Sequence, residues 1–287
     1  MYQIPDSRDA RAVENRVCAI FGSLYAGAST DFIRGIFAEI SAMFEGRSYD
    51  FQPNNLGYHD YTHTLQATDC LAQMLHGYVS SQPEEPLAAR HFELGIASMM
   101  FHDTGYLCSR SDDVGTGAKY TYTHVLRSCA VAASLLPRHG VTLGEIDGLL
   151  GAIRCTGPTA DITRLHFSGR TQRLLGCAVS TADYLAQMAA PDYPDELGVL
   201  FHEFEESDDY LNVPREKRVF KSVEDLIAKT PMFWSKVVEP KLNQDFDQMY
   251  LYLATPYPDG PNPYLLAIEK NLERIKAMAD APSPITT

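Results

Sequence analysis

The sequence has few of the features that support a disulfide framework, a zinc ribbon or a membrane span. Its six cysteines are scattered and none forms a Cys-x-x-Cys pair, so we expect buried free thiols in a reducing compartment. No run of 18 apolar residues occurs, and the first residues show neither a basic region nor the apolar segment of a signal peptide. These absences predict a cytoplasmic protein without a membrane-spanning segment.

Basic residues are also scarce. The chain has 24 Lys and Arg against 37 Asp and Glu, which gives a formal net charge of −13. Such a surface repels nucleic acid polymers and anionic membranes. We therefore expect a small-molecule partner, with no nucleic acid and no membrane, and the sequence leaves a homo-oligomer open.

Alternating strand patterns are missing, whereas apolar residues recur at helical spacing along most of the 287 residues. Thr142 and Glu145 form a capping-box pattern at the start of one predicted helix, and Thr230-Pro231 predicts the start of another after a helix over 222–229. With 45% hydrophobic residues, the chain can bury a large core. The sequence predicts one compact all-α domain.

One apolar helical run, residues 94–101, ends in His102-Asp103 and is followed by Gly105. Ligand-type side chains at the end of a buried helix need compensation, either as a hydrogen-bonded pair or by a divalent metal. Upstream, His59 and His63 are four residues apart, which predicts one face of a helix. Downstream, Asp183 lies among apolar helical neighbours. Each feature has a structural explanation alone, but together they form an N/O ligand set suited to zinc, iron, manganese or magnesium.

This pattern resembles the HD-domain superfamily of metal-dependent phosphohydrolases over roughly residues 55–190. The resemblance implies that the metal ligands are His63, His102, Asp103 and Asp183, and that Asp103 can bridge to a second metal. A histidine of this region binds the second metal in dinuclear members, which makes His124 a candidate. The cofactor expected is one or two divalent ions of Mg, Mn, Zn or Fe.

The segment Tyr58-His59-Asp60-Tyr61-Thr62-His63 is similar to the Tyr-His-Asn-x-x-His motif of class I cyclic-nucleotide phosphodiesterases, a branch of the same superfamily. The similarity implies that His59 is the general acid, and Asp60 replaces the Asn of the motif. Tyr106 stands where other branches have His or Lys, so it could offer substrate only a hydroxyl. Arg127, one turn after His124, is a candidate phosphate-binding cation.

The resemblance implies hydrolysis of a small phosphoester, a nucleotide and conceivably a cyclic one, by metal-activated water. His59 and Asp103 are the expected catalytic residues. The alternatives are a di-iron oxygenase of the same fold and a catalytically weak sensor that binds metal or nucleotide. The expected organisation is N-terminal helices in 1–54, an HD-type metal-binding catalytic core in 55–190, C-terminal helices packing on it in 191–281 and a disordered tail in 282–287.

Overall fold

The computed structural model describes residues 4–157 and 160–280, and in these ranges the chain is helical, as predicted. The only extended pairing described is an isolated bridge between Phe51 and Ser109. Ten α-helices are described: α1 (Ala10–Leu24), α2 (Asp31–Phe44), α3 (Tyr61–Ser80), α4 (Ala89–Phe101), α5 (His124–Leu135), α6 (Leu143–Arg154), α7 (Arg170–Ala189), α8 (Tyr193–Tyr210), α9 (Val223–Phe233) and α10 (Pro263–Asp280).

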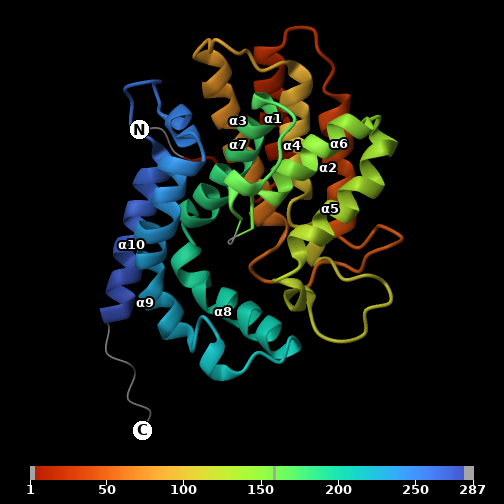
Figure 1. The fold of residues 1–287 in the computed structure, drawn as a ribbon. Helices are drawn as coiled ribbons and strands as arrows, with labels where there is room; N and C mark the ends of the chain where they lie inside the picture. Colours follow the sequence, from red (N-terminus) through yellow and green to blue (C-terminus); the bar gives the residue numbers. More distant parts are fainter. Residues whose placement is uncertain (1–3, 158–159, 281–287) are drawn as a thin grey trace.

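Helices α3 and α7 form the centre of the fold and pack against each other. Around them, α1 and α4 pack on α3, while α6 and α10 pack on α7. Figure 1 shows α9 and α10 on the opposite side of the molecule from α5 and α6, with α8 running beneath. Because α3 and α7 are enclosed by other helices, polar side chains on their facing surfaces are removed from bulk water.

Two predicted helix starts have different outcomes. The capping box of α6 is present, with the Thr142 side chain accepting from the backbone of Glu145 and the Glu145 carboxylate accepting from the backbone of Thr142. The start predicted at Thr230-Pro231 is wrong, because both residues lie inside α9. Thr230 Oγ1 donates to the Leu226 carbonyl, as a hydroxyl inside a helix commonly does.

Short helical turns connect the α-helices. After α9 the chain continues in two π-helical turns, Trp234–Val238 and Lys241–Asp245, on either side of Pro240. The 3₁₀ turns are Thr104–Tyr106, Gly117–Tyr120, Leu136–His139, Ile162–Arg164, Arg215–Lys217 and Met249–Leu253. The first two of these turns lie next to each other and border the candidate site described below.

All six cysteines are buried and unpaired, as the sequence predicts. No helix in the described part of the chain combines the length and hydropathy that a membrane span requires. The tail predicted at 282–287 lies outside the described residues.

Candidate metal centre

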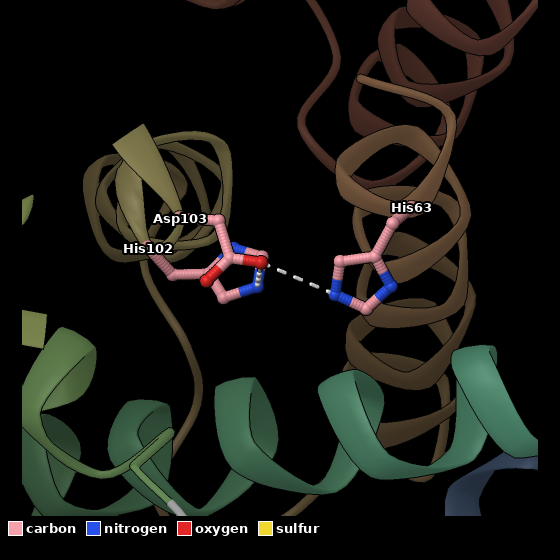
Figure 2. Close-up of side chains that lie close together, drawn as sticks. All are labelled: His63, His102 and Asp103. Atoms are coloured by element: carbon pink, nitrogen blue, oxygen red, sulfur yellow. Dashed lines mark ion pairs between the residues drawn. The ribbon is translucent and has the colours of Figure 1, made fainter. Parts of the chain in front are cut away.

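Side chains from α3, α4 and α7 converge on one buried point between these helices. His63 lies in the first turn of α3, and Figure 2 shows its ring facing the His102-Asp103 pair at the end of α4, with α7 passing below. Asp103 Oδ2 lies 3.4 Å from His63 Nε2 and 3.3 Å from His102 Nε2. Asp183 Oδ1, from α7, lies 3.2 and 3.5 Å from the same two nitrogens. The four residues predicted as ligands are therefore brought together.

The bonding of His102 shows what this cluster requires. Its Nδ1 lies 2.6 Å from the Met99 carbonyl, and because a carbonyl only accepts, Nδ1 carries the proton. Nε2 is buried, faces two carboxylates and has no hydrogen-bond partner among the described residues. A lone pair in that position needs a cation, either a proton or a metal ion. His63, His102 and Asp103 each offer one ligand atom within 4.8 Å of the others, so this group could hold a metal ion.

The charges of the cluster stabilise one another, because each imidazole lies beside carboxylates of opposite charge. Burial lowers the pKa of His102, but the carboxylates of Asp103 and Asp183 outweigh it and raise that pKa well above 6.5. Burial disfavours both carboxylate anions, yet the imidazoles outweigh it. The pKa of Asp103 therefore lies well below its usual value, and that of Asp183 falls to about 2. The cluster therefore favours two ionised carboxylates together with a protonated His102.

The other oxygen of Asp103 faces a second imidazole. His124, the first residue of α5, places Nε2 3.7 Å from Asp103 Oδ1. Its Nδ1 donates to the Thr121 carbonyl at 2.7 Å, which leaves Nε2 as a lone pair. Burial, the largest effect, lowers the pKa of His124, so the ring is neutral. Asp103 thus lies between the nitrogens of His63 and His102 on one side and that of His124 on the other, so it could bridge two metal ions.

His59 lies at the edge of the cluster, but not where helical spacing predicts it. The N-cap of α3 is Asp60, whose side chain accepts from the His63 backbone at 2.9 Å. Asp and Asn cap helices equally well, which explains how Asp60 can replace the Asn of the motif. His59 therefore precedes the helix and does not share a helical face with His63. Its ring lies 5.9 Å from the His63 ring, centroid to centroid.

Glu203 of α8 holds His59 in place and was not predicted. His59 Nδ1 lies 2.6 Å from Glu203 Oε2, and Glu203 Oε1 accepts from the Tyr58 backbone at 2.8 Å. Burial lowers the pKa of His59, but the hydrogen bond to Glu203 and the nearby carboxylates outweigh it and raise that pKa. The site therefore extends beyond the predicted 55–190 core. Glu203 lies on the buried face of α8 with Leu200 and Ser207. Its helical spacing from these residues is the sequence signal that could have found it.

Tyr106 is part of this arrangement through its ring. The ring stacks on His59 on one side and on His124 on the other, with centroid separations of 4.4 Å in both cases. Tyr106 is only 2% exposed, and burial raises the pKa of its phenol well above 10, against a hydrogen bond with Thr121. These contacts do not favour the predicted role of the hydroxyl in binding substrate.

Arg127 is not brought to the cluster. Its guanidinium donates to the backbone carbonyls of Gly105 and Leu107, at 2.6 and 2.8 Å, and lies 3.5 Å above the Tyr120 ring. These contacts favour a structural role, in which Arg127 ties the turn after Asp103 to α5. The prediction that it binds phosphate gains no support, because the helix directs its side chain toward this turn.

A polar cavity of about 120 Å³ reaches His63 from outside the cluster. Tyr58, Gln187 and Glu196 line it, and Arg8 at its edge pairs with Asp192. Drug-sized ligands occupy cavities of about 300–1,000 Å³, so this space admits only a small group without movement of its walls.

Comparisons of the chain with models of protein families, with curated proteins and with solved structures find no match. The resemblance to the HD-domain superfamily therefore stays a prediction from motifs, and function has to be inferred from the geometry of this centre.

Proposed function

We propose that the protein is a metal-dependent phosphohydrolase of the HD-domain type that cleaves a small phosphoester. The observation that carries the proposal is the buried cluster in which the lone pair of His102 faces two carboxylates. It is completed by His59, a proton carrier held at its edge by Glu203. His63, His102, Asp103 and Asp183 would hold the metal. A bound divalent metal supplies an activated water and neutralises phosphoryl charge.

The protein itself supplies the proton for the leaving oxygen. With His59 Nδ1 donating to Glu203, the proton to be transferred resides on Nε2. The raised pKa of His59 favours a protonated ring, as a general acid requires. Glu203 fixes the ring orientation and stabilises the imidazolium before transfer. Such an arrangement serves cleavage of a phosphoester, where an alkoxide must leave.

The substrate class follows from charge. The cations that follow Asp103 in sequence, Arg110, Lys119 and Arg127, are bound to backbone carbonyls, so phosphate charge would be met by metal and by His59. We propose a small phosphoester, with nucleotides and cyclic nucleotides among the substrates to test.

A di-iron oxygenase is the second candidate, and the position of His124 favours it. Because His124 faces the free oxygen of Asp103, a second metal would have two protein ligands there. Two iron atoms per chain with oxygen consumption and no phosphate release would select this alternative. A sensor without turnover is less well supported, since it has no use for the His59–Glu203 pair.

The deciding experiment compares His59→Ala with His202→Ala. His202 is a matched control, since its side chain is 69% exposed and pairs with Glu205 on the surface of α8. Both variants and the wild type would be assayed for phosphate release from cyclic nucleotides, linear nucleotides and an aryl phosphoester, with Mn, Mg, Zn or Fe added. We expect His59→Ala to lower kcat by about 10²–10⁴-fold with unchanged metal content, and His202→Ala to match the wild type. Wild-type turnover that His59→Ala leaves intact would remove His59 as the acid.

Glu203→Gln tests whether the carboxylate of Glu203 supports His59 as the proton donor. The amide can still accept a hydrogen bond but no longer balances the imidazolium, so the pKa of His59 falls. We expect kcat to fall by about 10–100-fold, and the alkaline side of the pH–rate profile to shift to lower pH, because His59 loses its proton at a lower pH. A profile identical to that of the wild type would show that Glu203 only packs against His59.

A further inference from the structure

Three flat rings from separate segments stack in one column beside the candidate centre. His59 precedes α3, Tyr106 ends the 3₁₀ turn after Asp103, and His124 begins α5. The Tyr106 ring is nearly parallel to both imidazoles, with interplanar angles of 18° to His59 and 14° to His124. The column therefore joins the proposed proton donor to the imidazole that faces the free oxygen of Asp103.

The backbone that carries Tyr106 is held tightly. A Cβ added at Gly105 would lie 1.9 Å from the His124 carbonyl oxygen, and one added at Gly117 would lie 2.1 Å from the Tyr106 carbonyl oxygen. The Gly105 amide donates to Ser128 Oγ at 2.8 Å, and Arg127 binds the Gly105 carbonyl. Because backbone contacts fix this turn on both sides, the ring of Tyr106 has little freedom to move away from His59 and His124.

In the described part of the chain, each imidazole otherwise makes one hydrogen bond. His59 Nδ1 is bound to Glu203 and His124 Nδ1 to the Thr121 carbonyl. A ring held by one hydrogen bond can still tilt about that bond, which would swing Nε2 away from its target. A stacked ring on its face removes this freedom, since tilting would drive the imidazole into the tyrosine.

We propose that Tyr106 is a positioning residue, whose flat ring fixes the orientation of His59 and His124 together and so links the proton donor to the second half of the metal centre. The ring performs this role and the buried hydroxyl does not. The inference rests on the proposed function for its effect on turnover, but its effect on His124 can be measured without any substrate.

The test compares Tyr106→Phe, which keeps the ring, with Tyr106→Leu, which removes it. Tyr78→Leu is the matched control, because Tyr78 is a buried tyrosine that contacts Tyr252 and the Glu85 carbonyl instead of the cluster. Each metal-free protein would be titrated with Mn²⁺ to obtain the number and affinity of bound ions. The imidazole signals of His59 and His124 would be followed by NMR, and kcat and KM measured on the best phosphoester.

We expect Tyr106→Phe to stay within about 3-fold of the wild type in every measurement. Tyr106→Leu should lower kcat by about 10–100-fold at constant KM and weaken the second Mn²⁺ ion at least about 10-fold. It should also broaden or shift both histidine signals. If Tyr106→Leu does not fold, Tyr106→Met fills similar volume with a flexible chain that has no flat face.

Two results would overturn the proposal. Equal losses in Tyr106→Phe and Tyr106→Leu would assign the role to the hydroxyl. A Tyr106→Leu protein that differs from the wild type no more than Tyr78→Leu does would show that the ring only fills space. If the wild type hydrolyses no phosphoester, the proposed function fails, while the Mn²⁺ titration and the histidine signals still decide the role of Tyr106.

Discussion

Two buried carboxylates near α3 illustrate two ways to place a negative charge inside this protein. Asp69, 1% exposed, accepts from Arg16 Nη2 at 2.9 Å and from Ser7 Oγ at 3.0 Å. Asp103 is equally enclosed, but its contacts are imidazoles at 3.3–3.7 Å. An arginine is a permanent cation, whereas an imidazole can give up its proton. The charge of Asp69 is therefore paired permanently, whereas a metal ion could replace the proton on the imidazoles around Asp103.

The largest expected effect separates the two carboxylates by metal content. Asp103→Asn keeps the shape of the side chain but removes the charge, so we expect it to lose metal and to lower phosphate release by at least about 10³-fold. Asp69→Asn should keep its metal and stay within about 3-fold of the wild type. Elemental analysis of both variants with a turnover assay checks this. Full metal loading in Asp103→Asn would refute the site assignment.

The free energy of unfolding, measured with and without metal, further separates a carboxylate paired with arginine from one at the proposed metal site. We expect Asp69→Asn to lower the free energy of unfolding by about 2 kcal/mol with or without metal, because Arg16 loses its partly buried counter-charge. Metal at 100 times its Kd should add about 2.7 kcal/mol to the wild type and to Asp69→Asn, and almost nothing to Asp183→Asn. Chemical unfolding of the wild type, Asp69→Asn and Asp183→Asn with and without Mn²⁺ measures these changes. An equal gain in Asp183→Asn would exclude that residue as a ligand.

The pH dependence of the metal-free protein is a further test. The pKa of His102 is raised above 6.5 in the folded state, so its contribution to stability is present below pH 6.5 and is lost as the pH rises through the folded value. The pKa of Asp183 is lowered from 3.8 to about 2, so its contribution is present above 3.8 and is lost as the pH falls toward 2. We expect the cluster to stabilise the metal-free protein most between these limits.

Unfolding free energies at a series of pH values, for wild type and His102→Gln, measure this effect. The variant should lose the alkaline decline that His102 causes, whereas Asp69→Asn should keep it. Metal should bind more tightly as the pH rises above 6.5, because it displaces the proton of His102. An alkaline decline that His102→Gln leaves unchanged would contradict this reading.

The smallest effect on activity is expected at Arg127. Like Arg16, it is a cation bound within the fold, so Arg127→Met should cost about 1 kcal/mol of stability and leave kcat and KM within about 3-fold. Steady-state kinetics beside an unfolding curve provide the test. A rise in KM of more than about 10-fold would restore Arg127 as a phosphate ligand.

Local apolar patterns predict the helical class, whereas the resemblance to the HD-domain superfamily implied the four residues that converge. Apolar spacing defines the helices, and His102-Asp103 stands at the end of a helix that is buried on all sides. Asp69 and Asp183 look alike at this level, since each lies among apolar helical neighbours. The difference between them is Arg16, which lies 53 residues before Asp69 and contacts it only in the folded chain.

The remaining features depend on tertiary contacts. Glu203 reaches His59 across 144 residues of chain, from a helix that contains several other acidic residues. His59 was predicted on a helical face because spacing alone does not reveal that Asp60 caps the helix. The Thr230-Pro231 signal failed because proline is accepted inside α9, where packing on α8 and α10 stabilises the helix. In these cases the local sequence allows more than one structure, and tertiary packing determines which one forms.

The four proposed ligands lie in or next to three separate helices, and this bears on when a metal could bind during synthesis. His63, the His102-Asp103 pair and Asp183 meet only when α3, α4 and α7 have docked, so the proposed metal has no assembled site on the nascent chain. If the helices associate before a metal binds, the raised pKa of His102 lets a proton offset the two carboxylates. Metal acquisition would be a late exchange on a finished fold, in which the ion displaces the proton that accompanied folding.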